Sequence, residues 1–145
     1  YIEGRELYVS VLGNHRLQVL PTWEIFLDKL PEEAAKIATR KVKWNLDYQQ
    51  KYGVRIGRAK GLSEDTERRI ARLSRRICRR LGTDGCVRID FRLDESGGLY
   101  FLEANPNPDI GEFEEFAGAA KAAGMSYPDL LQKIVNLGIR RAERG

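Results

Sequence analysis

Apolar and polar residues alternate along two short segments in the second half of the chain. Residues 87–93 read Val-Arg-Ile-Asp-Phe-Arg-Leu, and residues 99–104 read Leu-Tyr-Phe-Leu-Glu-Ala. Alternation of this kind is typical of β-strands, because successive side chains of a strand point to opposite faces. The segment between them, residues 94–98, reads Asp-Glu-Ser-Gly-Gly and favours a tight turn. The sequence therefore predicts a β-hairpin here.

Helical periodicity is strongest just before that hairpin. Ser63 is a preferred helix N-cap, and the pattern continues to about Leu81, where Gly82 supplies a stop. The apolar positions of this helix form one predicted stripe, at Ile70, Leu73, Ile77 and Leu81. Two further helices are predicted at residues 113–123 and 127–142, the second capped by Ser126 with Pro128 in its first turn.

The first part of the chain predicts further strands. Leu7–Leu12 is rich in β-branched and aromatic residues, and Leu17–Leu20 can return after the turn signal Gly13-Asn14. Trp23–Leu27 is a third extended stretch, whereas residues 28–61 read as a long irregular connection with short helical pieces. The order of elements predicts the α+β class, with an antiparallel β-sheet flanked by helices in one domain over residues 1–145.

Charge and cysteine content add two interpretations. The net charge is +4, and much of the excess lies between Arg68 and Arg80, around the apolar stripe of the predicted helix. A solvated helix face explains this pattern, and a basic nucleic-acid-binding module that uses this helix is the alternative, although no aromatic residues interleave to stack on bases. Cys78 and Cys86 fit buried, reduced thiols of a cytoplasmic protein, and His15 falls in a predicted turn, exposed and uninvolved. No apolar run reaches the roughly 18 residues that a membrane span needs.

Polar residues of the predicted hairpin form a candidate site. Arg88 and Asp90 share one face of the first strand, and Glu103 and Asn105 share one face of the second. A turn with an even number of residues would place Asp90 opposite Glu103 and Arg88 opposite Asn105, whereas an odd turn would separate the pairs. Carboxylate and amide oxygens suit a hard cation, and an arginine beside them suits a phosphoryl group. The alternative is an ordinary solvent-facing surface with cross-strand ion pairs.

These motifs resemble those of a known family. Residues 85–91 and 100–106 together resemble the paired metal-binding strands of ATP-grasp enzymes, and of D-alanine–D-alanine ligases most of all. Residues 3–6, Glu-Gly-Arg-Glu, resemble the stretch after that family's adenine-contacting hinge, and Lys51-Tyr52 resembles the pair on its flexible loop. Residues 123–131 resemble its closing helix, so the resemblance spans nearly the whole chain. It implies the C-terminal portion of an ATP-grasp domain, as a fragment of a longer protein.

The resemblance implies a phosphoryl-transfer site. Asp90, Glu103 and Asn105 would hold magnesium, or manganese in its place, with Glu103 bridging two ions. Arg88 would bind the γ-phosphate of ATP and stabilise the tetrahedral intermediate. Lys51, on the irregular connection, would reach the terminal phosphates when its loop closes. A relative of the family that has lost catalysis is a further alternative.

The resemblance also implies nucleotide contacts and leaves the acceptor open. Glu6 would hydrogen-bond the ribose, Ile2 would present its backbone to adenine, and Leu102 would pack on the ring. Asp109 stands where the family has a glycine, and Glu114 about where it has the serine that receives the second amino acid's carboxylate. Acidic side chains repel a carboxylate, which disfavours D-alanine as acceptor and favours a cationic or amine-rich one. Alternatively, the acidic residues of this loop only favour the start of the next helix.

The activity implied is an ATP-dependent ligase that joins a carboxylate to an amine through an acyl-phosphate. The partners are then small-molecule carboxylate and amine substrates, in a cytoplasmic protein that does not bind membranes or nucleic acid. A homodimer is left open for the full-length form. The chain on its own is expected to bind ATP weakly and not to catalyse.

Overall fold

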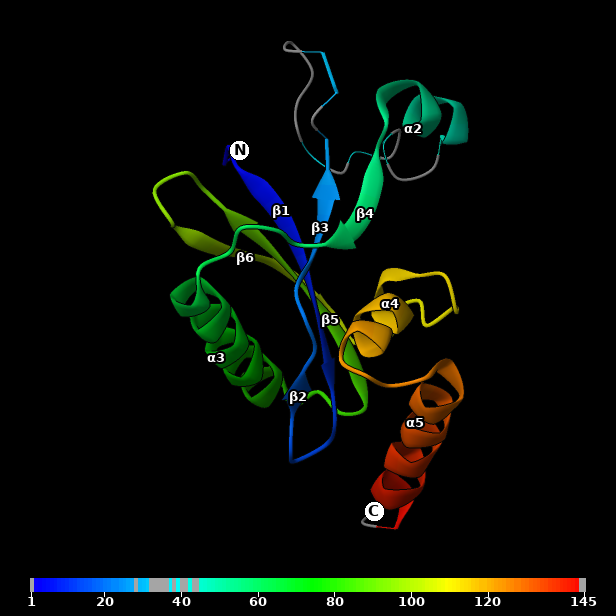
Figure 1. Ribbon diagram of the computed structural model, residues 1–145. Coiled ribbons are helices and arrows are strands. Elements are labelled where there is room, and N and C mark those ends of the chain that lie inside the picture. The colour runs from blue at the N-terminus through cyan, green and yellow to red at the C-terminus, as the bar shows by residue number, and fades with distance from the viewer. Residues whose placement is uncertain are drawn as a thin grey trace.

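The computed structural model describes residues 2–27, 29–31, 37, 39, 42 and 45–143. In this part of the chain, β4, β3, β1, β5 and β6 lie side by side in that order, and β2 pairs with β1 (Figure 1). All of these pairings are antiparallel, which confirms the predicted α+β class with an antiparallel sheet. The described elements are β1 Arg5–Leu12, β2 Gln18–Val19, β3 Trp23–Phe26, α2 Leu46–Tyr52, β4 Arg55–Arg58, α3 Glu64–Leu81, β5 Cys86–Leu93, β6 Leu99–Asn105, α4 Glu115–Ala122 and α5 Tyr127–Ala142.

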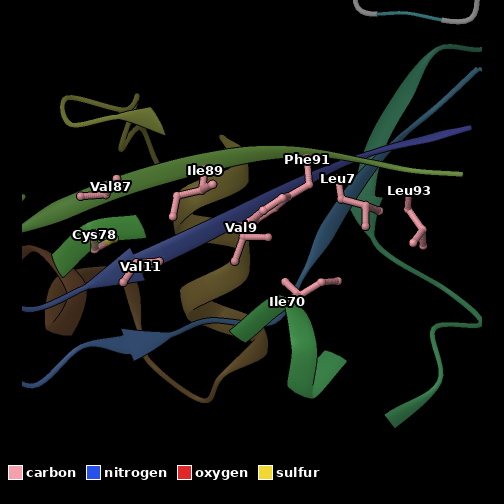
Figure 2. Packing of buried hydrophobic residues seen from close by; sticks show 9 residues of the cluster. All are labelled: Leu7, Val9, Val11, Ile70, Cys78, Val87, Ile89, Phe91 and Leu93. Carbon is pink, nitrogen blue, oxygen red and sulfur yellow. The ribbon is translucent and has the colours of Figure 1, made fainter. Parts of the chain in front are cut away.

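Helices cover both faces of the sheet. α3 packs on one face, and α4 with α5 packs on the other (Figure 1). The core under α3 consists of alternate residues of the two central strands together with two residues of the helix (Figure 2). Its members are Leu7, Val9, Val11, Ile70, Cys78, Val87, Ile89, Phe91 and Leu93. Because every second residue of β1 and β5 faces this core, the intervening residues are directed to the opposite face, where α4 lies.

The prediction for α3 is confirmed at both ends. The hydroxyl oxygen of Ser63 accepts a hydrogen bond from the backbone N–H of Thr66, and Gly82 ends the helix in the left-handed conformation, at φ 63°. The predicted stripe is wrong at Leu81, which is 58% exposed. Leu81 is the last residue of the helix, and packing against the sheet ends one turn earlier at the fully buried Cys78.

The other predicted elements are present within a few residues of their expected bounds, and one element, β4, was missed. β2, β3, α4 and α5 are found, with Ser126 capping α5 through the backbone N–H of Asp129. Residues 28–61, expected to be irregular with short helical pieces, contain the short helix α2 and also β4, although several of these residues, Asp28 among them, lie outside the described part. β4 gave little signal because it is an edge strand whose sequence, Arg-Ile-Gly-Arg, is largely exposed.

The structure also tests the expectations for the two cysteines, for His15 and for membrane-spanning helices. Cys78 and Cys86 are free thiols, the first buried and the second half-buried. Burial raises the pKa of both, and that of Cys86 reaches about 11. His15 is exposed in the bend after β1. Among the described helices, none has the length and apolar character needed to cross a membrane.

The hairpin has the predicted pairing for a reason that the sequence reading did not foresee. Leu93 pairs with Leu99, so five residues separate the strands and the turn is odd. The even turn on which the predicted pairing depended is therefore not present. A β-bulge after Asp90 restores the pairing: Phe91 pairs with Phe101 and Asp90 with Glu103, which leaves Leu102 as an extra residue on β6. The bulge thus places Glu103 opposite Asp90, as the site requires.

Close packing of α4 on the sheet predicts an unusual response to an alanine substitution. A Cβ added at Gly118 would lie 2.4 Å from Cη2 of Trp23, whose ring packs between two buried clusters. Gly118→Ala is therefore expected to lower the free energy of unfolding by about 1–3 kcal/mol, although alanine is the better helix former. Gly138→Ala in α5, where no atom lies within 4 Å of the added Cβ, is expected to raise it by about 0.5–1 kcal/mol. Equal effects of the two substitutions in chemical denaturation would contradict the packing described.

Candidate active site

Two strands place the four candidate residues together on the face of the sheet toward α4. Arg88 pairs with Asn105 and Asp90 pairs with Glu103 across β5 and β6. On the other side of β5, Tyr8 of β1 pairs with Asp90, which brings its ring to the same face. The structure therefore assembles all four side chains in one place, as the sequence predicted.

Arg88 is the centre of this group. Its Nε and Nη2 donate to the two carboxylate oxygens of Asp90, at 2.8 and 3.0 Å, which is the paired geometry of a guanidinium on a carboxylate. Its Nη1 donates to Oε1 of Glu115 at 2.5 Å, and its Nη2 lies 3.7 Å from Oε1 of Glu103. The guanidinium also lies over the ring of Tyr8, 5.1 Å from the ring centre. One cation is thus held among three carboxylates.

Burial makes this arrangement strongly ionic. Asp90 is 2% exposed and Glu115 is 8% exposed, so both carboxylates depend on Arg88 for their charge balance. Burial alone would lower the pKa of Arg88, but the hydrogen bonds and charge of Asp90, followed by those of Glu115, outweigh it and raise that pKa. The pKa of Tyr8 is raised by burial first and then by the charges of Glu6 and Asp90. Both shifts favour the usual charge state of each group at neutral pH, which is a cationic arginine and a neutral tyrosine.

The oxygen donors fit a hard cation in type. Asp90 and Glu103 provide two carboxylates on adjacent strands, and Asn105 adds an amide oxygen, which is the donor set that magnesium takes in nucleotide enzymes. Glu103 is the accessible member, with 60% of its side chain exposed. The side-chain oxygen of Asn105 also accepts a hydrogen bond from the backbone N–H of Asn107. No group of three or more His, Cys, Asp or Glu side chains suited to a metal is found in the part of the chain that the structure describes.

A second polar group lies near the start of β1, on the same face. Glu6 is 7% exposed; its Oε1 accepts from the hydroxyl of Tyr8 at 3.1 Å, and its Oε2 lies 3.3 Å from Nη1 of Arg92. Nε of Arg92 donates to the backbone carbonyl of Ile2 at 3.0 Å. Glu6 and Arg92 also line a cavity of about 310 Å³. Glu6 and Ile2, which the sequence singled out separately, are thus connected through Arg92.

Two predicted residues lie apart from these groups. Leu102 is the bulge residue of β6 and is 47% exposed. Lys51 is in the last turn of α2, a short helix within the long connection, and its Nζ lies 5.1 Å from the ring centre of Tyr52. α2 packs beside β3 and β4, whereas the four central residues lie toward the other edge of the sheet (Figure 1).

Sequence reasoning missed three residues of the site: Tyr8, Arg92 and Glu115. Strand alternation places Arg92 on the same face of β5 as Arg88 and Asp90 but indicates no role for it, and the same rule could have assigned Tyr8 to that face of β1. Glu115 gave no such signal, because an acidic residue at a helix start is ordinary. Two other acidic residues of this loop differ in their contacts. Asp109 accepts from the backbone N–H of Gly111 at 2.9 Å, whereas the exposed Glu114, the N-cap residue of α4, makes no capping hydrogen bond with its side chain.

Comparison with known proteins identifies the family. A sequence profile described as the D-ala D-ala ligase C-terminus matches residues 1–136. An uncharacterized protein, y4sG, of Sinorhizobium fredii is 32% identical over 145 residues, which cover 97% of this chain and 40% of that protein. A D-alanine–D-alanine ligase of Nitrosospira multiformis is 36% identical over 141 residues, which cover 94% of this chain and 40% of that protein.

The fold is also that of solved ligases. The crystal structure of a D-alanine–D-alanine ligase from Bacillus anthracis complexed with ATP superposes with a TM-score of 0.73 at 23% identity, over 100% of this chain and 42% of that one. The chain spans about two-fifths of the length of the curated relatives that it matches. The profile match over most of the chain, together with the shared fold, shows that the chain belongs to the D-alanine–D-alanine ligase family of ATP-grasp proteins and corresponds to its C-terminal part.

Proposed function

We propose that the full-length gene product is an ATP-dependent ligase that joins a carboxylate to an amine, and that this chain carries the phosphate and metal end of its active site. The observation that carries the proposal is the convergence of Arg88, Asp90, Glu103 and Asn105 on one face of a sheet in a chain of this family. An ordinary solvent-facing sheet surface accounts less well for Arg88 and Asp90, because both are largely buried.

The metal end of the site is assigned to the oxygen donors. Asp90, Glu103 and Asn105 would hold magnesium, or manganese in its place, and such an ion would offset the negative charge of the ATP phosphates. Asp90 is paired to Arg88 through both of its oxygens. Each of these oxygens has a second lone pair that a metal ion could use, and Arg88 could also release one of the oxygens when a ligand binds. A phosphate group near Arg88 provides an alternative partner for the released N–H groups.

The reaction would proceed in two steps. A carboxylate oxygen of the first substrate attacks the γ-phosphorus of ATP, the bond from that phosphorus to the β,γ-bridging oxygen breaks, and ADP leaves. The amine of the second substrate then attacks the acyl carbon of the acyl-phosphate, loses a proton and expels inorganic phosphate. Arg88 would stabilise the negative charge on the transferred phosphoryl group and on the tetrahedral intermediate. The remaining catalysis is positioning, so few acid–base groups are needed.

The nucleotide contacts extend from the phosphate end to the start of β1. We assign Glu6 to the ribose hydroxyls, the backbone of Ile2 to the adenine edge, and Leu102 to the face of the ring. Glu6 lines the cavity at this end, and Leu102 is exposed, so both can be reached by a ligand. Lys51 is assigned to the terminal phosphates, which requires α2 to approach the polar face of the sheet.

The acceptor is not assigned to a single amino acid. Glu115 contributes its charge to Arg88, and Asp109 caps its own turn, so these two acids are already engaged within the chain. Glu114 remains exposed at the start of α4. Its carboxyl group is partly desolvated, and this effect, followed by the charges of Glu115 and Asp109, raises its pKa. An amine-bearing acceptor is consistent with this charge, and a free carboxylate is disfavoured.

The proposed function is tested by amino-acid-dependent ATP turnover of the full-length gene product. ADP and phosphate release would be measured with magnesium and a panel of carboxylate–amine pairs, which includes D-alanine, other amino acids, and amines that lack a carboxylate. We expect turnover above the ATP-only background with at least one pair, and a peptide product in equal amount to the phosphate released. ATP turnover that no carboxylate–amine pair stimulates would contradict a ligase.

A further inference from the structure

Arg92 is a buried cation outside the four-residue centre. It is 3% exposed, and it lies on the same face of β5 as Arg88 and Asp90. A guanidinium at this depth has to be compensated by acceptors, because an isolated buried charge is very unfavourable. Two of the acceptors are the Ile2 carbonyl, 3.0 Å from Nε, and Glu6 Oε2, 3.3 Å from Nη1.

The side chain of Arg92 connects the segment before β1 to β1 itself, because one of these acceptors lies in each. Ile2 precedes β1, whereas Glu6 is within it and pairs across the sheet with Arg92 itself. The planar guanidinium presents its N–H groups at fixed angles, so one arginine sets the position of the carbonyl relative to the carboxylate. Lysine has a single ammonium on a flexible chain and cannot reproduce this geometry.

A cavity lies beside the same group. Glu6 and Arg92 both line it, together with Glu3 and Gly4 of the segment before β1. Its volume of about 310 Å³ is in the range of small-molecule sites. Glu6 therefore faces a space that a ligand can enter while its Oε1 is held by the hydroxyl of Tyr8 and its Oε2 by Arg92.

We propose that Arg92 is a positioning residue that determines recognition of the nucleotide's ribose. It holds the Glu6 carboxylate toward the cavity, and it holds the Ile2 carbonyl at a set distance from that carboxylate. A carboxylate held in this position can accept hydrogen bonds from the two ribose hydroxyls, whereas a displaced one does so poorly. This inference rests on the proposed function, because it takes the nucleotide to bind along this face.

The test compares two nucleotides that differ only in the ribose hydroxyls. Dissociation constants for ATP and 2′,3′-dideoxy-ATP, each with magnesium, would be measured by calorimetry on the full-length gene product. We expect the wild type to prefer ATP about tenfold or more, the effect of charged hydrogen bonds. Arg92→Met is expected to weaken ATP about tenfold or more and to remove most of that preference.

Two further variants make the result specific. Arg92→Lys keeps the positive charge but lacks the planar guanidinium, and it is expected to retain only part of the preference for ATP over 2′,3′-dideoxy-ATP. This variant preserves the test if Arg92→Met does not fold. Arg72→Met removes an exposed arginine from α3, on the opposite face of the sheet, and is expected to leave both dissociation constants unchanged. An Arg92 variant with the wild-type ratio of the two constants would overturn the inference, even if both affinities fell. A wild type that binds neither nucleotide would overturn the proposed function as well.

Discussion

Replacing Glu103 by glutamine is expected to lower amino-acid-dependent ATP turnover of the full-length gene product on the order of 100-fold, the loss typical when one preorganised electrostatic group of an active site is removed. Glutamine has the same shape but no charge, so it is a poor ligand for a hard cation. The side chain is 60% exposed, and its contact with Arg88 is long, at 3.7 Å. The substitution should therefore leave the free energy of unfolding nearly unchanged.

The matched control is Glu67→Gln, which makes the same chemical change at an exposed position in the first turn of α3. Turnover by this control should equal that of the wild type. If Glu103→Gln also turned over ATP at the wild-type rate, the assignment of Glu103 to the metal would be wrong. A loss of turnover accompanied by an equal loss of stability would indicate a structural role instead.

The second large effect is expected from Arg88→Met, on stability as well as on turnover. The substitution leaves the carboxylates of Asp90 and Glu115 buried without their shared cation, at 2% and 8% exposure. Breaking a buried ion pair on one side costs about 3–5 kcal/mol. Because protonation removes the uncompensated charge, the loss of stability should be larger at about pH 8 than at about pH 5.

Urea denaturation at the two pH values measures this effect. The double variant Arg88→Met, Glu115→Gln should be more stable than Arg88→Met alone, because one of the two carboxylates that lose Arg88 is then uncharged. Arg72→Met, on the exposed surface of α3, should change stability by less than about 0.5 kcal/mol. A loss below about 1 kcal/mol for Arg88→Met, the same at both pH values, would contradict the ionic centre described here.

The part of the site that the sequence could predict is the part governed by strand alternation. Arg88 and Asp90 are two residues apart on a strand, and Glu103 and Asn105 are two apart on the next, so each pair had to share a face. Which faces coincide depends on the turn and on any bulge between them. Here the turn is odd and Leu102 bulges, and the two irregularities cancel. A bulge of this kind has no clear sequence signature, which is why the correct pairing was expected for the wrong reason.

Contacts between distant segments lay beyond sequence reasoning. Glu115 reaches Arg88 from 27 positions away, and the carbonyl of Ile2 reaches Arg92 from 90. Such contacts depend on where α4 and the start of β1 pack, and local periodicity does not encode this. The same limit explains the exposure of Leu81. It lies at a core-facing helical angle, but the helix has by then passed the edge of its packing against the sheet.

The acidic loop after Asn105 leads into α4, whose first residue, Glu115, contacts Arg88. Glu115 is part of the Arg88 centre, so the start of α4 is tied directly to the proposed phosphate site. A change in the partners of Arg88 when phosphate binds would therefore be felt at α4 and at the loop before it.

The most direct test of the central claim is Mn²⁺ binding to the full-length gene product, measured by electron paramagnetic resonance in the presence of a non-hydrolysable ATP analogue. Wild type, Asp90→Asn and the control Asp65→Asn, at an exposed position of α3, would be titrated in parallel. If Asp90, Glu103 and Asn105 hold the metal, Asp90→Asn weakens Mn²⁺ binding at least about tenfold, and the control binds as the wild type does. Equal Mn²⁺ affinity in Asp90→Asn and the wild type would contradict the site.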